Sequence, residues 1–172
     1  MPEDEKLAFY LRHREQIEEW ASLRSHAEEV LNAQLWESAR RLALNLPEAG
    51  VLLEKRWGYE HVFIPAAVEF PRMGMGLAWR KSGLMGAGPT LAVTCLDGRQ
   101  SNQYEALKSA TQAVGLAHGL DKFGASEWLW KTQLRPPSGL MDLSAFAGDC
   151  LDRLQRMWAD MSPRVRQMLN SG

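Results

Sequence analysis

The 172-residue sequence predicts an α+β fold, in which helices flank a mainly antiparallel sheet of about five strands. Two observations carry this prediction. Residues 3 to 46 contain neither proline nor glycine and repeat apolar side chains every three or four positions, the period of one helix face. After Pro47 and Gly50 the pattern becomes short and extended, as in strands. Strands that follow one another along the chain favour an antiparallel sheet over alternating βαβ units.

The N-terminal helical segment is too long to lie straight within a small domain. About forty helical residues span roughly 60 Å, whereas a compact chain of this size has a radius of gyration near ~16 Å. Ser25 and Glu28 have the spacing of a capping box, which favours a second helix beginning after residues 22 to 25. We therefore expect an N-terminal αα-hairpin or a long bent helix.

Five strands are expected in the body of the protein, bounded by turn residues and enriched in apolar and aromatic side chains. They are residues 51 to 57 and 61 to 64, joined through Gly58 as a β-hairpin, and residues 75 to 80, 90 to 96 and 126 to 132. The three glycines of residues 82 to 89 predict a loop between the third and fourth strands.

Helices are expected after the fourth and fifth strands. The first begins near Asn102, whose side chain can cap it, and ends near Gly119. The second begins at Asp142, and the pair Ser162 and Pro163 has the N-cap and N1 spacing that restarts a short last helix. These are the C-terminal helices of the predicted fold.

Composition and charge exclude several classes of protein. The length suits a single domain, residues 1 to 172, made of a helical segment, 1 to 48, and an α+β body, 49 to 172. The net charge of −1 gives no general attraction to nucleic acids or anionic membranes. No apolar run approaches the ~18 residues that span a bilayer, and two cysteines make no disulfide framework. We expect a cytoplasmic protein.

Motifs for catalysis and metal binding are missing from the sequence. No two of the four histidines stand at i and i+4, so the zincin pattern is absent, as are the P-loop and the nucleophile elbow. We assign no catalytic residue, no metal ligand and no cofactor. Cys95 is expected to be a buried small hydrophobe, unless His61 or His118 lowers its pKa. We predict that no cleft brings either histidine within ~3 Å of an acid or of Cys95, because such a cleft would favour an enzyme over an interaction module.

One strand carries a face without side-chain bulk. Gly74, Gly76 and Ala78 alternate along the third predicted strand, so all three lie on the same side of the sheet. A dinucleotide site would need a third glycine and a following helix, and neither is present. We expect a helix to pack against this face.

The cluster Tyr10, Arg12, His13 and Arg14 is the candidate partner-binding site. Arg14 interrupts the apolar stripe of its helix, so it needs a carboxylate. Either an acid within residues 15 to 19 or elsewhere supplies it, or the arginine anchors a partner protein, because Tyr, Trp and Arg dominate interface hot spots. We expect Tyr10, Arg12 and His13 to be at least partly exposed. Three apolar residues are expected to hold the helix to the fold: Leu11, Ile17 and Trp20.

A second candidate site is a basic and aromatic group that could bind nucleic acid. Indole rings can stack on bases, and nearby cations can neutralise phosphates. Because the cations are few, we expect any such binding to be weak and strongly dependent on salt. The group consists of Trp79, Arg80, Lys81, Trp128, Trp130, Lys131 and Arg135.

The order of FYLRHREQIEEWASLR, short strands, a tryptophan-rich strand and a terminal helical segment resembles that of small uncharacterised bacterial proteins. It is also similar to that of accessory modules of restriction-endonuclease-like (PD-(D/E)xK) proteins in genome defence. The nuclease family needs an acid followed by E-x-K on adjacent strands. Here Lys55 and Arg56 follow Glu54, so no catalytic residue carries over. The resemblance implies an accessory module without the active site.

These observations together predict a non-enzymatic macromolecular interaction module, a bacterial accessory or regulatory protein in a genome-defence or mobile-element context. A protein partner is expected, a homodimer is left open, and no membrane is involved. Two alternatives stay open. One is a nucleic-acid-binding accessory protein. The other is an enzyme whose site is assembled from dispersed residues such as His61, Glu69, Arg80 and His118.

Overall fold

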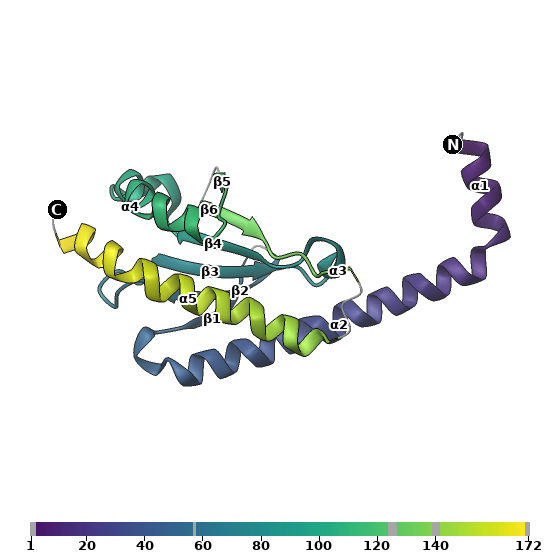
Figure 1. The fold of residues 1–172 in the computed structure, drawn as a ribbon, viewed down its shortest axis with the longest axis horizontal. Coiled ribbons are helices and arrows are strands. Elements are labelled where there is room, and N and C mark those ends of the chain that lie inside the picture. The colour runs from purple at the N-terminus through teal and green to yellow at the C-terminus, as the bar shows by residue number, and fades with distance from the viewer. Residues whose placement is uncertain (1–2, 57, 124–126, 139–141, 171–172) are drawn as a thin grey trace.

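The computed structural model describes residues 3–56, 58–123, 127–138 and 142–170, and it confirms the α+β class (Figure 1). The strands are β1 (Leu52–Arg56), β2 (Tyr59–Pro65), β3 (Met73–Trp79), β4 (Thr90–Cys95), β5 (Lys122–Phe123) and β6 (Trp128–Gln133). The helices are α1 (Glu3–Arg12), α2 (Arg14–Asn45), α3 (Leu84–Ala87), α4 (Tyr104–Ala117) and α5 (Leu143–Asn170). Single 3-10 turns lie at Pro47–Ala49 and Gly98–Gln100.

All the strands belong to one antiparallel sheet, in the order β1-β2-β3-β4-β6-β5. The predicted hairpin is confirmed, because β1 and β2 pair across a turn in which Gly58 has a φ of +76°. The short strand β5 at one edge is an addition to the five expected strands. The predicted loop of residues 82 to 89 contains the single turn of α3.

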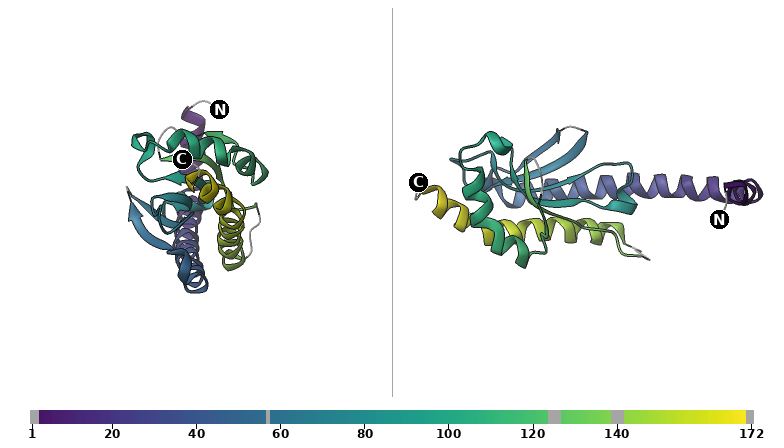
Figure 2. Two further views of the ribbon diagram at one scale, coloured as in Figure 1. Left: turned by 90° about the vertical axis from the view of Figure 1, so that its left-hand side faces the viewer. Right: turned by 90° about the horizontal axis from the view of Figure 1, so that it is seen from above.

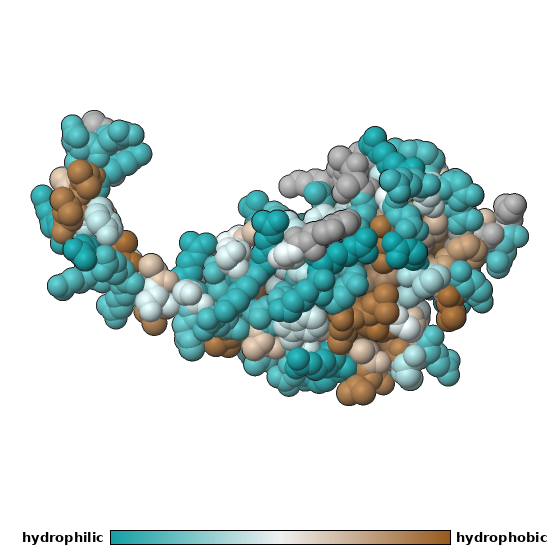
Figure 3. All heavy atoms as spheres, turned by 180° about the vertical axis from the view of Figure 1, so that it is seen from behind, coloured by the Kyte–Doolittle hydropathy of each residue, from teal (hydrophilic) through white to brown (hydrophobic). Residues whose placement is uncertain are grey.

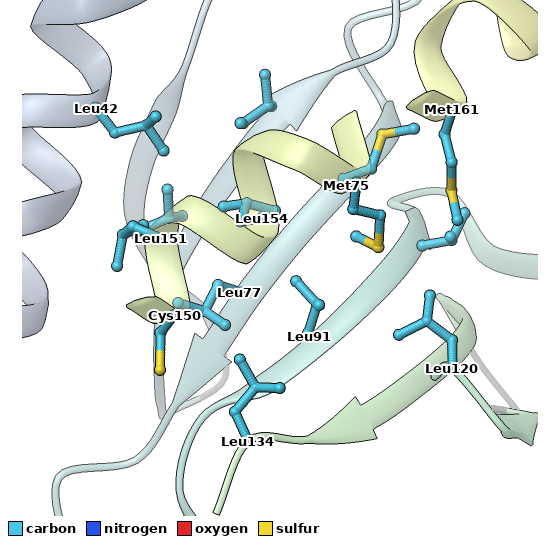
Figure 4. Close-up of a cluster of buried hydrophobic side chains, with 14 of the residues drawn as sticks. Leu42, Met75, Leu77, Leu91, Leu120, Leu134, Cys150, Leu151, Leu154 and Met161 are labelled. Atoms are coloured by element: carbon cyan, nitrogen blue, oxygen red, sulfur yellow. The ribbon is translucent and has the colours of Figure 1, made fainter. Parts of the chain in front are cut away.

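The helices of the described residues cover one face of the sheet only. The second half of α2, the whole of α4 and the length of α5 lie on this side, with α5 running across β3 between the other two (Figures 1 and 2). The core fills the space between α5 and the strands, where Leu151 and Leu154 of the helix face Met75 and Leu77 of β3 (Figure 4). All four side chains are buried.

Helix α5 is continuous through Pro163, so the predicted restart at Ser162 and Pro163 is wrong. Tertiary contacts hold the last turns in place. The indole N–H of Trp158 donates to the Pro65 carbonyl at 2.8 Å, and the Arg166 Nε donates to the Ala66 carbonyl at 2.9 Å. Both bonds anchor the helix to the end of β2, and they lie on either side of the proline.

The N-terminal segment is a long bent helix and not a hairpin (Figure 1). Helix α2 runs unbroken through residues 22 to 25, where a new helix was expected. The capping box does not form, since Glu28 pairs with Arg24 at 3.4 Å within the same helix. The bend falls at His13, whose amide N–H bonds the carbonyls of Phe9 and Tyr10.

Candidate functional site

The N-terminal arm, residues 3–23, extends away from the body (Figures 1 and 2). Along the helix the first fully buried side chain is Leu31, and the first contacts with the body come near Arg24 and Glu29. The carboxylate of Glu29 pairs with the Lys81 ammonium at 2.9 Å. Everything N-terminal to these contacts lacks cover from the rest of the described chain.

The arm is rich in exposed apolar side chains. Six of the ten large hydrophobic side chains that are exposed in the described residues belong to it, including Leu11 at 62% and Trp20 at 65%. Figure 3 shows apolar surface along this arm, separated from the body by a polar stretch. The other four of the six are Leu7, Phe9, Tyr10 and Leu23.

This apolar stripe continues the face of α2 that packs on the body. Leu31, Leu35 and Leu42 are buried on the face of α2 that packs on the body. Trp20 and Ile17 follow on the same helix face toward the N-terminus, at spacings of three, four or seven residues. The expectation that Leu11 and Trp20 hold the helix to the fold is therefore wrong. The apolar stripe therefore extends along the helix beyond the part that packs on the body.

A polar cluster holds the bend between α1 and α2. The Tyr10 hydroxyl donates to Glu18 Oε1 at 3.2 Å, and Arg14 Nε donates to the same oxygen at 2.9 Å. The rings of Phe9 and His13 lie 4.5 Å apart on the bend. The predicted pairing of Arg14 with an acid of residues 15 to 19 is confirmed, although its side chain is exposed.

Two of the four predicted partner-binding residues are thus engaged within the arm itself. Tyr10 and Arg14 share Glu18, whereas Arg12 is exposed and has no ion-pair partner within the part of the chain that the structure describes. His13 is half-buried at the bend. The expected partial exposure of Tyr10, Arg12 and His13 is confirmed.

Acid is expected to loosen this bend. The hydrogen bond from Arg14 is the main cause of a pKa below the ordinary value at Glu18. The contribution of Glu18 is therefore complete above the pKa of free glutamate, about 4.3, and is lost as pH falls through the lowered folded-state pKa. Spin labels at K6C and S22C should report a broader distance distribution in this acid range.

The Glu18→Gln variant is the control for this pH dependence. It should give the broad distance distribution at every pH, because the neutral amide cannot form the ion pair with Arg14. An unchanged distribution in the parent protein between neutral pH and the acid range would show that Glu18 does not set the bend.

The structure separates the predicted nucleic-acid group onto different surfaces. Trp79 is buried on the helix side, with its N–H donating to Asn32 Oδ1 at 2.9 Å. Trp130 is half-buried on the same side and donates to the Lys108 carbonyl at 3.1 Å. Neither ring is free to stack on a base. Lys81 is paired with Glu29 of α2. Arg135 is exposed beyond the end of β6.

Trp128, Lys131 and Arg80 lie on the other face of the sheet, which no helix covers. The Lys131 ammonium is 5.3 Å from the Trp128 ring centroid, and the Arg80 guanidinium is 4.3 Å from the ring of Tyr59. The Tyr59 and Trp128 rings meet edge to face at 5.5 Å. Tyr59, Trp128 and Lys131 line one side of a pocket, and Arg80 lies beside it over the Tyr59 ring.

The sheet curls around this pocket. In a flat sheet β1 and β6 would be about 19 Å apart, four strand spacings of ~4.8 Å, yet Arg56 of β1 reaches Glu127, just before β6, at 3.6 Å. Gly74, Gly76 and Ala78 of β3 lie on the concave face of the curled sheet. The expected helix against this bare face is therefore wrong, and small residues instead allow the two rims of the sheet to approach.

The pocket has a volume of about 250 Å³. We call it the concave pocket, and its lining residues are Arg56, Tyr59, His61, Ala78, Glu127, Trp128 and Lys131. The lining joins cations, a carboxylate, a histidine and aromatic rings.

His61 lies at the floor of the concave pocket and is 3% exposed. Burial lowers its pKa, although Glu54 Oε1 lies 3.5 Å from Nδ1 and opposes the shift. The imidazole is thus neutral at neutral pH. Its Nε2 lies over Gly76, at 2.8 Å from the place that a Cβ would take there, and Thr94 Oγ1 lies 3.2 Å from the same place.

Three buried polar atoms around this floor lack a hydrogen-bond partner among the described residues: His61 Nε2, Thr94 Oγ1 and Glu127 Oε2. Burial also raises the pKa of the Glu127 carboxyl. Buried polar atoms in folded proteins are nearly always bonded, and an unpaired one costs about 1–3 kcal/mol. A cluster of three beside a pocket marks a place where a bound group would complete the bonding.

The prediction that no cleft brings either histidine within ~3 Å of an acid is wrong for His118, whose Nε2 lies 2.8 Å from Asp160 Oδ2. His61 stays outside that limit, at 3.5 Å from Glu54. The pair of His118 and Asp160 ties the C-terminal end of α4 to α5. It is a structural contact between two helices at the surface.

The dispersed enzyme site considered from the sequence is not assembled. Glu69 lines a groove of about 710 Å³ beside Trp158 and Arg166, whereas His61 lies in the concave pocket. Cys95 is buried with its thiol directed to the Gly98 carbonyl at 3.6 Å, and burial raises the thiol pKa. The described residues contain no group of three histidine, cysteine, aspartate or glutamate side chains able to hold a metal.

Comparison with protein families, with curated proteins and with solved structures finds no match to this chain. The resemblance to accessory modules of genome defence therefore stays a prediction. Within the described ranges, no helix has both the length and the apolar character that crossing a bilayer requires.

Proposed function

We propose that this protein is a macromolecular interaction module that binds a protein partner through its N-terminal arm. The observation that carries the proposal is the apolar stripe on an uncovered helix. Isolated helices of ordinary sequence are marginal in water, and exposed apolar patches on a soluble protein commonly mark interaction sites. Binding would bury Trp20, Leu11 and their neighbours and would supply the packing that the arm lacks.

The chemistry of the arm indicates what kind of surface would receive it. Its apolar residues call for a hydrophobic groove, as in other recognition of amphipathic helices. Residues 3–23 carry six acids and three bases, so a groove with a basic rim fits best. Arg12 is exposed beside the stripe and could make a bidentate contact with an acid within that rim.

A pair of double variants tests this proposal. Trp20→Ala with Leu23→Ala removes two exposed apolar groups from the arm, and Leu44→Ala with Leu116→Ala removes two equally exposed groups from the body. Hot-spot residues contribute at least ~2 kcal/mol to binding, so the arm variant should weaken partner binding about 30-fold or more.

Stability is the necessary second measurement. Both double variants should keep the parent thermal midpoint, because exposed positions usually change stability by less than ~0.5 kcal/mol. If the two variants weaken binding equally, the arm is not the binding surface. If the arm variant lowers the midpoint strongly, its side chains are structural.

A further inference from the structure

We propose that the concave pocket binds a nucleobase, or a heteroaromatic ring of that size, with its edge toward His61 and Glu127. This site is independent of the arm and lies on the opposite side of the sheet from the helices. Its recognition would combine an aromatic wall with hydrogen bonds to a ring that both donates and accepts.

The charge of the pocket favours a neutral ring over an anion or a cation. Arg56 lies between two carboxylates, 3.9 Å from Glu54 and 3.6 Å from Glu127. Lys131 adds a second cation. Positive and negative groups are therefore balanced around the cavity. The buried Glu127 would repel a small carboxylate ligand. Arg56 and Lys131 would repel a cationic ligand.

The unpaired atoms of the pocket require hydrogen-bond donors. A carboxylate only accepts. Glu54 beside Nδ1 of His61 therefore favours the tautomer with the proton on Nδ1, which leaves Nε2 as an acceptor. Glu127 Oε2 is a second acceptor; it receives no hydrogen bond within the described residues, although the Arg56 guanidinium lies 3.6 Å away. Nucleobases present amino and imino N–H groups next to ring nitrogens and carbonyls, so one edge can serve these acceptors and also receive a bond from Lys131.

The aromatic wall and the volume set the size of the ligand. Tyr59 and Trp128 meet edge to face in the lining of the pocket, and aromatic rings of this kind stack on bases in other base-binding pockets. A volume of about 250 Å³ is below that of sites for drug-sized molecules, ~300–1,000 Å³. The pocket therefore admits one base and excludes a duplex.

The rim of the pocket suits the group attached to such a base. Arg80 lies over Tyr59, and Lys131 lies over Trp128. Both cations are therefore next to the aromatic wall, where the phosphate of a nucleotide would extend. A free nucleotide and a single strand with one base inserted share this chemistry.

Calorimetric titration of the full chain tests the proposal with four nucleoside monophosphates, AMP, GMP, CMP and UMP, and with a mixed-sequence ten-nucleotide single-stranded DNA. We expect at least one probe to bind at millimolar concentration or below. Glu127→Gln should weaken that binding about tenfold, and so should Trp128→Ala. The matched control Glu105→Gln makes the same chemical change at an exposed site of α4 and should leave binding unchanged.

Each pattern of results has a defined meaning. Equal loss for a mononucleotide and for the strand supports a pocket for free nucleotides. Binding of the strand alone, with the same two variant effects, supports insertion of a base from a strand. Absence of binding by all five probes at 1 mM overturns the proposal, as does strand binding that neither Glu127→Gln nor Trp128→Ala changes. The thermal midpoint of each variant shows whether it is folded. If one variant does not fold, the binding measured for the other variant tests the proposal.

Discussion

Gly74→Ala is expected to destabilise the protein by more than ~3 kcal/mol. A Cβ at this position of β3 would overlap the backbone of β2, because it would contact the Ile64 carbonyl oxygen and would lie 2.9 Å from both the Ile64 carbonyl carbon and the Pro65 Cα. Backbone atoms of a paired strand cannot move aside as a flexible side chain can, so the cost exceeds the usual ~1–3 kcal/mol of overpacking.

Gly148→Ala is the matched control for this prediction. Gly148 lies in helix α5 with open space around the position of a Cβ. Alanine is favoured over glycine in a helix by ~0.5–1 kcal/mol, so the two substitutions should change the free energy of unfolding in opposite directions. Urea unfolding followed by circular dichroism measures both. A Gly74→Ala protein as stable as the parent would mean that β2 and β3 do not approach so closely.

Trp79→Ala is expected to cost about 3–5 kcal/mol, the usual range for a buried aromatic residue. The Trp79 ring is 1% exposed and packs edge to face on Trp36 of α2 at 5.6 Å. Its removal also leaves the Asn32 side chain of α2 without the bond it accepts. At this chain length the thermal midpoint should fall by roughly 10 °C.

Trp128→Ala is the comparison within the same sheet. Trp128 is half-buried on the concave face, where its contact with Tyr59 contributes ~0.5–1.5 kcal/mol, so its replacement should cost no more than ~2 kcal/mol. The predicted order of stability is parent, Trp128→Ala, Trp79→Ala. The reverse order would contradict the assignment of Trp79 to the core between sheet and helices.

Local patterns predicted the elements of this fold well where each element is determined by its own residues. The apolar period of residues 3 to 46, the turn at Gly58 and the strand around Trp128 all have the structures that they indicate. Strict alternation would put Trp128 and Trp130 on one face, but an irregularity in the pairing with β4 puts them on opposite faces. Local signals failed where distant contacts decide. Pro163 would end an isolated helix, but bonds from α5 to the end of β2 keep the helix continuous across it.

The concave pocket could not be predicted from sequence for the same reason. Arg56 and Glu127 are separated by 71 positions and meet only because the whole sheet curls. One signal was present, the run Gly74, Gly76 and Ala78, which marked a bare strand face. Sequence alone does not say whether such a face receives a helix or the opposite rim of its own sheet, since both need the same small side chains.

The N-terminal arm shows the limit of periodicity in another way. The stripe through Ile17, Trp20 and Leu31 keeps a helical period on both sides of a slip at Arg24. Nothing in that period indicates where the body ends and the uncovered helix begins. Only the three-dimensional arrangement distinguishes Leu31, which is fully buried, from Trp20, which is 65% exposed.

Photo-crosslinking in the native host tests the proposed role of the arm most directly. A benzoylphenylalanine in place of Trp20 puts the crosslinker on the stripe, and the same residue in place of Leu44 puts it at an exposed position of the same helix within the body. The account predicts a discrete intermolecular adduct from position 20, to another protein or to a second copy of this chain, and none from position 44. Adducts from position 44 alone, or crosslinks from position 20 only to the protein's own body, would contradict it.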